Sequence, residues 1–260
     1  MVKIFREFFC LHRKFLLFNL ISRSIKLKYR KSYLGLLWTA LAPAFSAMIY
    51  FFVFRFVIKV QVPNYMTFIL SGILAWGFFS ASLTNGLESI VGNYGLVSKV
   101  PIPLNVFALN ECVTLFINFL ISQPILLLIM FFTNTPFTVN LLYIPLLYLF
   151  LFLQGYSLAL LLAILFVYFR DLRHLLALLL QMLFYMTPIV YTMDMVPEKL
   201  IGYTYFIPHF YIFEGIHRVV AKGTPMGMME LATSATWTVG IFFSTMLIFY
   251  KTRHILAEKI

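Results

Sequence analysis

The chain has 260 residues, of which 62% are apolar and only 11% charged, and its mean hydropathy is +0.93. A soluble domain of this length cannot bury so much apolar surface, so the composition excludes a soluble globular protein and indicates an all-α integral membrane protein. The net charge of +11 does not indicate nucleic-acid binding, because Lys and Arg stand beside apolar runs of bilayer length instead of covering a polar surface.

Residues 1–33 are predicted to form a cytoplasmic amphipathic segment at the membrane interface. Helical spacing places two sets of side chains on different faces, an apolar set of Leu11, Phe15, Phe18, Ile25 and Tyr29 and a basic set of Arg23, Lys26 and Arg30. Its apolar run is short and no small-residue cleavage site follows, so the segment is interpreted as mature protein. It is either an orientation anchor on anionic headgroups or a basic collar at a substrate entrance.

Six apolar runs approach the roughly 20 residues that a helix needs to cross a bilayer. The predicted spans are residues 34–54, 66–87, 106–132, 141–169, 175–191 and 231–250. The fifth is the shortest and contains Gln181 and Pro188.

An even number of spans places both termini on the same side of the membrane. With six spans, fifteen Lys and Arg residues flank that side, nine of them before Ser32, and four flank the other. The positive-inside rule therefore predicts that both termini are cytoplasmic.

The cytoplasmic loop between the second and third spans is bordered by Glu88 and Glu111. Carboxylates at membrane depth are costly and usually face protein or water. We expect them to anchor the loop through Lys99 or backbone donors, and a direct role in transport is the alternative.

The one long outer loop, residues 194–230, is too apolar to be a solvated linker. Pro197, Pro208 and Pro225 divide it into pieces that are predicted to form short helices at, or dipping into, the outer interface. The loop is either a re-entrant cap that closes the bundle or an outer gate.

Residues that carry catalytic or metal chemistry are sparse. Cys10 and Cys112 are single cysteines, the five histidines have no ligand spacing, and no GxxxxGK[ST] phosphate loop is present. We therefore predict a chain that is not an enzyme, holds no metal and binds no cofactor itself.

A few polar and aromatic residues of the first span are candidates for contact with a substrate. Arg55 is expected to reach the outer headgroups, with a pore-lining role as the alternative. Tyr33, Trp38 and Tyr50 are aromatic residues for which a sugar-binding role is considered beside lipid contact.

Three motifs resemble those of type-2 ABC transporter permeases that export polysaccharides. They are "KLKYRKSYLGLLWTALAP" before and within the first span, "LVSKVPIPLNVFALNE" between the second and third, and "FVYFRDLRHLLALLLQMLFYMTPIVYTMDMVP" around the fifth. The resemblance is closest to the O-antigen exporters of the bacterial inner membrane. It implies a six-helix ABC-2 type transmembrane domain at 34–260.

The resemblance also implies partners. Two permease copies form a homodimer with two copies of a separate ABC ATPase, which uses the ATP, and the complex exports a polyprenyl-pyrophosphate-linked polysaccharide. Loop 93–105 is then the coupling loop, with Asn93, Leu96, Val97, Lys99 and Pro101 as ATPase contacts. Segment 194–230 is the outer gate, with Pro197, Tyr205, Pro208 and Phe210 as gate residues. Arg30 and Lys31 are expected to meet the pyrophosphate at the cytoplasmic entrance, and Tyr33, Trp38, Tyr50 and Arg55 are the further candidates for the entrance and the channel.

Other readings differ in cargo or in class. A capsule or teichoic-acid exporter would share the mechanism. A membrane-embedded glycan- or lipid-modifying enzyme would need a polar catalytic cluster at one membrane face. A flippase that works alone would be expected to show internal repeats and charges near the midplane.

Overall fold

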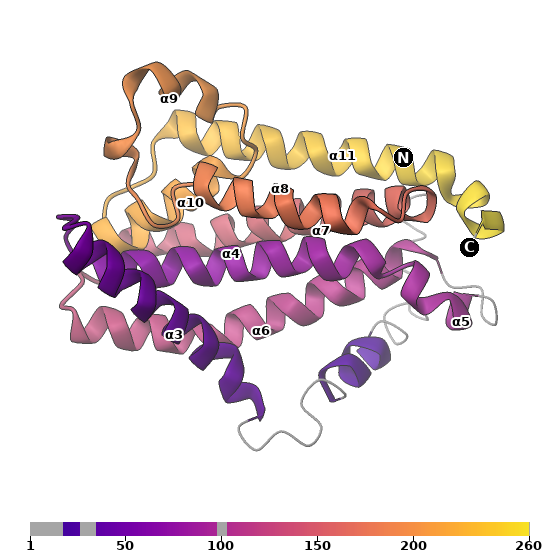
Figure 1. Ribbon diagram of the computed structural model, residues 1–260, viewed down its shortest axis with the longest axis horizontal. Helices are drawn as coiled ribbons and strands as arrows, with labels where there is room; N and C mark the ends of the chain where they lie inside the picture. The colour runs from indigo at the N-terminus through magenta and orange to yellow at the C-terminus, as the bar shows by residue number, and fades with distance from the viewer. Residues whose placement is uncertain (1–17, 27–34, 98–102, 260) are drawn as a thin grey trace.

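The structure is a computed structural model that describes residues 18–26, 35–97 and 103–259. Within these ranges all regular elements are helices, and the long ones other than α3 lie side by side along the long axis of the molecule (Figure 1). Predicted residues that fall between or before these ranges, such as Arg30, lie outside the described part of the chain.

The described helices follow one another from a short N-terminal helix to the long C-terminal one. They are a helix at 18–26, η1 (Gly35–Leu37), α3 (Trp38–Phe52), the π-helix η2 (Val53–Val57), α4 (Tyr65–Glu88), η3 (Val91–Asn93), α5 (Tyr94–Val97), α6 (Asn105–Phe132), η4 (Val139–Tyr143), α7 (Ile144–Tyr168), α8 (Leu172–Met186), η5 (Met193–Met195), α9 (Glu198–Thr204), α10 (Phe210–His217), the π-helix η6 (Arg218–Lys222) and α11 (Met228–Lys259).

Five helices of the described chain are long and apolar enough to cross a membrane. They span Trp38–Val57, Tyr65–Glu88, Asn105–Phe132, Val139–Tyr168 and Met228–Arg253. The prediction of an all-helical membrane protein is confirmed, and the bounds of these five spans lie within four residues of the predicted ones.

The predicted end of the fifth span is wrong, whereas its predicted start lies three residues from the observed one. Its helix, α8, is an apolar helix of 15 residues that begins at Leu172 and ends at Met186, not at Tyr191. Pro188 disfavours helical geometry at the preceding residue, and Thr187 is accordingly extended, with φ −98° and ψ 139°. At 1.5 Å per residue α8 is about 22 Å long, shorter than the roughly 30 Å hydrocarbon core.

Helix α4 is the centre of the bundle. It packs against α3, α6, α7, α8 and α10, and Phe68, Ile69 and Leu70 on it are fully buried. Near its end Gly86 faces Ala159 of α7 so closely that a Cβ at position 86 would collide with the alanine. Small residues of this kind let membrane helices approach closely where no water is available to drive association.

Helix α3 is the least buried long helix. Ala47 is its one buried residue, and large apolar side chains such as Phe45, Ile49 and Phe52 are exposed. In Figure 1, α3 (indigo) crosses the bundle obliquely instead of running along it. Most of its surface therefore remains for lipid or another protein.

Candidate functional site

The predicted entrance residues are only partly described. Arg30, Lys31 and Tyr33 lie outside the described residues. Trp38 begins α3 and is half exposed, whereas Tyr50 is half-buried with its ring 5.7 Å from that of Phe184 on α8. The side chain of Tyr50 therefore lies at the contact between its own helix, α3, and α8.

The predicted coupling loop begins with two short helices, η3 and α5, that leave the end of α4. Asn93 donates a hydrogen bond from Nδ2 to the carbonyl of Ser89 at 2.7 Å, which ties η3 to α4. Leu96 and Val97 lie in α5, while Lys99 and Pro101 lie outside the described residues.

Glu88 joins this loop to another helix. Its carboxylate is 2.6 Å from the guanidinium of Arg173, near the start of α8. The expected anchoring by Lys99 is not described, so Arg173 is the partner that the structure gives. Both side chains are about half exposed, and such pairs contribute at most about 1 kcal/mol.

The predicted gate residues separate into an exposed and a buried group. Pro197 and Tyr205 are exposed, Pro208 is half-buried, and Phe210 is fully buried at the start of α10. Two hydrogen bonds hold this stretch to the bundle, from Trp237 Nε1 to the carbonyl of Tyr205 at 2.8 Å and from Gln154 Nε2 to that of Pro208 at 3.1 Å.

Helix α10 dips into the bundle, and all eight of its residues are buried. Gly72 of α4 makes room for it, since a Cβ there would lie 2.8 Å from the imidazole of His217. The His217 ring stacks on Phe68 with centroids 3.8 Å apart, and its Nδ1 is 3.3 Å from the hydroxyl of Ser71. Through α10, segment 194–230 is therefore packed into the core of the bundle.

A second buried histidine fixes the turn after α8. His209 Nε2 lies 2.8 Å from the hydroxyl of Thr187, and the Tyr65 hydroxyl donates to the carbonyl of Val190 at 2.6 Å. Burial lowers the pKa of His209 to about 4 and that of His217 to about 3, so both are neutral at physiological pH.

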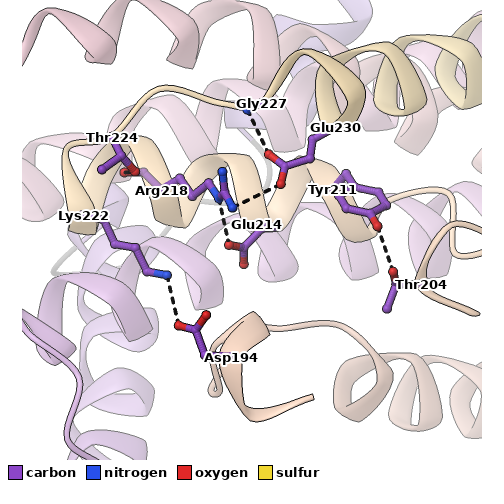
Figure 2. Close-up of polar contacts among 9 residues, drawn as sticks. All are labelled: Asp194, Thr204, Tyr211, Glu214, Arg218, Lys222, Thr224, Gly227 and Glu230. Atoms are coloured by element: carbon purple, nitrogen blue, oxygen red, sulfur yellow. Dashed lines mark hydrogen bonds and ion pairs between the residues drawn. The ribbon is translucent and has the colours of Figure 1, made fainter. Parts of the chain in front are cut away.

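A network of charges, which sequence reasoning missed, joins α10, η6 and α11 (Figure 2). Arg218 Nε lies 3.2 Å from the Glu214 carboxylate, and Arg218 Nη2 lies 3.3 Å from Glu230 Oε1. Glu230 also accepts a hydrogen bond from the amide of Gly227 at 3.0 Å. The spacing of Glu214 and Arg218, four residues apart in an otherwise apolar stretch, was the available signal.

The carboxylate of Glu214 is almost completely buried, at 2% exposure, while Arg218 is one-third exposed. Burial raises the pKa of Glu214, and the nearby Lys222 and Arg218 oppose that rise. Lys222 in turn lies 3.6 Å from Asp194 of η5. The network thus connects three pieces of segment 194–230, namely η5, α10 and η6, to the first turn of α11.

No group of three or more His, Cys, Asp or Glu side chains is placed for metal binding within the described ranges. The absence of a metal and of a cofactor from the whole chain stays a prediction. The candidate residues described above form packing contacts, hydrogen bonds and ion pairs at the two ends of the helical bundle.

A family model described as ABC-2 type transporter matches residues 16–220. The chain belongs to the ABC-2 type transporter family. The match runs from the N-terminal helix through α10 into η6, so it includes both the predicted coupling loop and most of segment 194–230. The resemblance that the three motifs predicted is confirmed.

Three relatives narrow the comparison within the family. The chain is 34% identical over 185 residues, 71% of each chain, to the O-antigen export system permease protein RfbA of Klebsiella pneumoniae. It is 32% identical over 200 residues, 76% of each chain, to the protein of the same name from Myxococcus xanthus. It is 22% identical over 243 residues to the polysialic acid transport protein KpsM of Escherichia coli, 90% of this chain and 92% of that one.

Proposed function

We propose that the chain is the membrane-spanning subunit of an ATP-driven exporter of lipid-linked O-antigen polysaccharide in the bacterial inner membrane. The observation that carries the proposal is the identity of 32–34% to two relatives named as O-antigen export permeases, against 22% to the polysialic acid transporter. A capsule or teichoic-acid exporter is the alternative, with the same mechanism and another cargo.

The proposal includes six spans, with α8 as the fifth. Helix α8 lies beside α7 and returns toward the end of the bundle at which α7 begins (Figure 1). Together with the turn at Thr187 to Tyr191, which is bound to α4 and to His209, it crosses the remaining distance. With six spans, the charge asymmetry of the sequence places both termini in the cytoplasm.

In this arrangement the start of α8 and the end of α4 are cytoplasmic, and the Glu88–Arg173 ion pair joins them next to α5. An ATPase that moves loop 93–105 would therefore displace α4 and α8 together. Since α4 also contacts α10, the displacement reaches the outer segment through packed side chains. Two such subunits and two ATPase copies complete the exporter that we propose.

The test is co-purification of this chain with an ABC ATPase from the same organism, followed by ATP hydrolysis in lipid nanodiscs. ATP hydrolysis that requires both chains supports the proposal. An equal rate of hydrolysis with and without this chain would show that the ATPase is not coupled to it. Loss of surface O-antigen in a deletion strain, restored by the gene, tests the cargo.

The entrance is tested by the double substitution of Arg30 and Lys31 by Gln. Because both charges are proposed to hold the pyrophosphate, export should fall while the complex with the ATPase still assembles. Unchanged export would remove both residues from the entrance.

A further inference from the structure

The turn that joins α3 to α4 forms an open pocket of about 460 Å³. Its lining residues are Arg55, Lys59, Val60, Gln61, Val62 and Pro63. Two of the six carry a positive charge and none carries a negative one, so the lining is suited to an anion.

The backbone of this turn is held in an uncommon geometry. Arg55 lies in the π-helix η2, and its guanidinium donates to the carbonyl of Val60 at 3.2 Å. The amide of Val60 donates in turn to the carbonyl of Phe54 at 2.9 Å. These bonds fold the turn back on the helix end and keep the Arg55 side chain at the pocket.

Lys59 adds a second unusual feature, a φ of +62°. This left-handed conformation is uncommon for a residue with a long side chain and persists only where its surroundings hold it. Single-turn π-helical insertions are likewise frequent at functional sites. The π-helix carries Arg55 and the left-handed position carries Lys59, so each feature places one positively charged side chain at the pocket.

Arg55 and Lys59 differ from the two cations of η6 in whether a carboxylate neutralises them. Arg218 and Lys222 are neutralised by Glu214, Glu230 and Asp194. In the described part of the chain, neither Arg55 nor Lys59 forms an ion pair with a carboxylate. Their positive charge is therefore available to a ligand.

We infer that this pocket binds the phosphate group of a lipid at the outer face of the membrane. The position at the outer face rests on the proposed function and its six-span orientation. At the end of a span, the pocket lies at headgroup depth, where a lipid phosphate meets Arg and Lys side chains. Gln61 supplies an amide donor beside the two cations.

Two lipids carry this chemistry, the phospholipids of the bilayer and an isoprenoid pyrophosphate that anchors an exported glycan. The experiment measures binding of two probes, short-chain phosphatidylglycerol and farnesyl pyrophosphate, to the purified full-length protein by native mass spectrometry. The test variant is the double substitution R55Q/K59Q. The control is K199Q, which removes an exposed charge from α9, away from the pocket lining.

Each cation near an anionic headgroup contributes a factor of about five to binding, so R55Q/K59Q should bind the occupying probe roughly twenty-five-fold more weakly. Weakening of farnesyl pyrophosphate alone assigns the pocket to the glycan anchor, and weakening of both probes assigns it to membrane phosphates in general. If R55Q/K59Q binds both probes as tightly as K199Q, the inference is wrong. Binding is read without ATP or transport, so that result would leave the exporter proposal intact.

Discussion

The Glu214–Arg218–Glu230 network provides the sharpest test of the outer segment. Substitution of Arg218 by Ala leaves the carboxylate of Glu214, only 2% exposed, without its nearest positive charge. Glu230 keeps the amide of Gly227 as a partner, so the cost falls mainly on Glu214.

The size of that cost follows from burial. Breaking a buried ion pair costs about 3–5 kcal/mol. Arg218 is one-third exposed and Glu214 can take up a proton, so we expect a smaller loss of about 2 kcal/mol. For a chain of this size that corresponds to a fall in Tm of about 4–8 °C. The double variant R218A/E214Q removes the stranded charge and should recover at least half of the loss.

The pH dependence of the Tm of R218A provides a second test of whether the buried charge of Glu214 causes the loss of stability. Burial already raises the pKa of Glu214, and loss of Arg218 raises it further. The folded variant then holds its proton at a pH where the unfolded chain has released it. The loss of stability in R218A relative to the wild type is therefore larger at pH 8 than at pH 5.

The assay is thermal unfolding of the purified protein in detergent, followed by the loss of the monodisperse peak in size-exclusion chromatography. The matched comparison is wild type, R218A, E214Q and the double variant at both pH values. Additive effects of the two substitutions, or a deficit in R218A that does not change with pH, would refute the reasoning.

Two further predictions address packing and topology. G86A should lower Tm, because the new Cβ collides with Ala159 and overpacking costs about 1–3 kcal/mol, whereas G77A, with open space around the new methyl group, should leave Tm unchanged; equal Tm values for the two variants would contradict the close α4–α7 contact. In a background without Cys10 and Cys112, Q61C should react with a membrane-impermeant maleimide in intact spheroplasts, while I255C, near the C-terminus, should react only after lysis; labelling of I255C in intact spheroplasts would overturn the orientation.

The sequence was most informative where one physical effect dominates. Five long apolar helices follow from hydropathy alone, because a helix must satisfy its backbone groups within the bilayer. The end of α8 was misjudged because apolar composition continues past Met186, while Pro188 and the extended backbone of Thr187 end the helix. Composition does not distinguish a continuing helix from a buried turn with the same residues.

The candidate sites were harder to predict from the sequence than the spans. Tyr50 and Phe210 were singled out as aromatic residues, but whether such a ring faces lipid, a channel or the core depends on the helices around it. The Glu214–Arg218–Glu230 network depends on a contact between η6 and α11, which no local pattern encodes. The predicted roles of the entrance, coupling and gate residues remain predictions.

The break at Thr187 and Pro188 has a mechanical consequence. On the side of the membrane where α8 stops, the wall of the bundle consists of a turn and α10, held by side-chain hydrogen bonds such as those of Tyr65 and His209. These bonds, each worth about 1 kcal/mol, add to the packing of α10, all of whose residues are buried. At this end the wall is therefore held by tertiary contacts of the turn and α10, whereas the rest of the bundle is held by the continuous backbone of the spans.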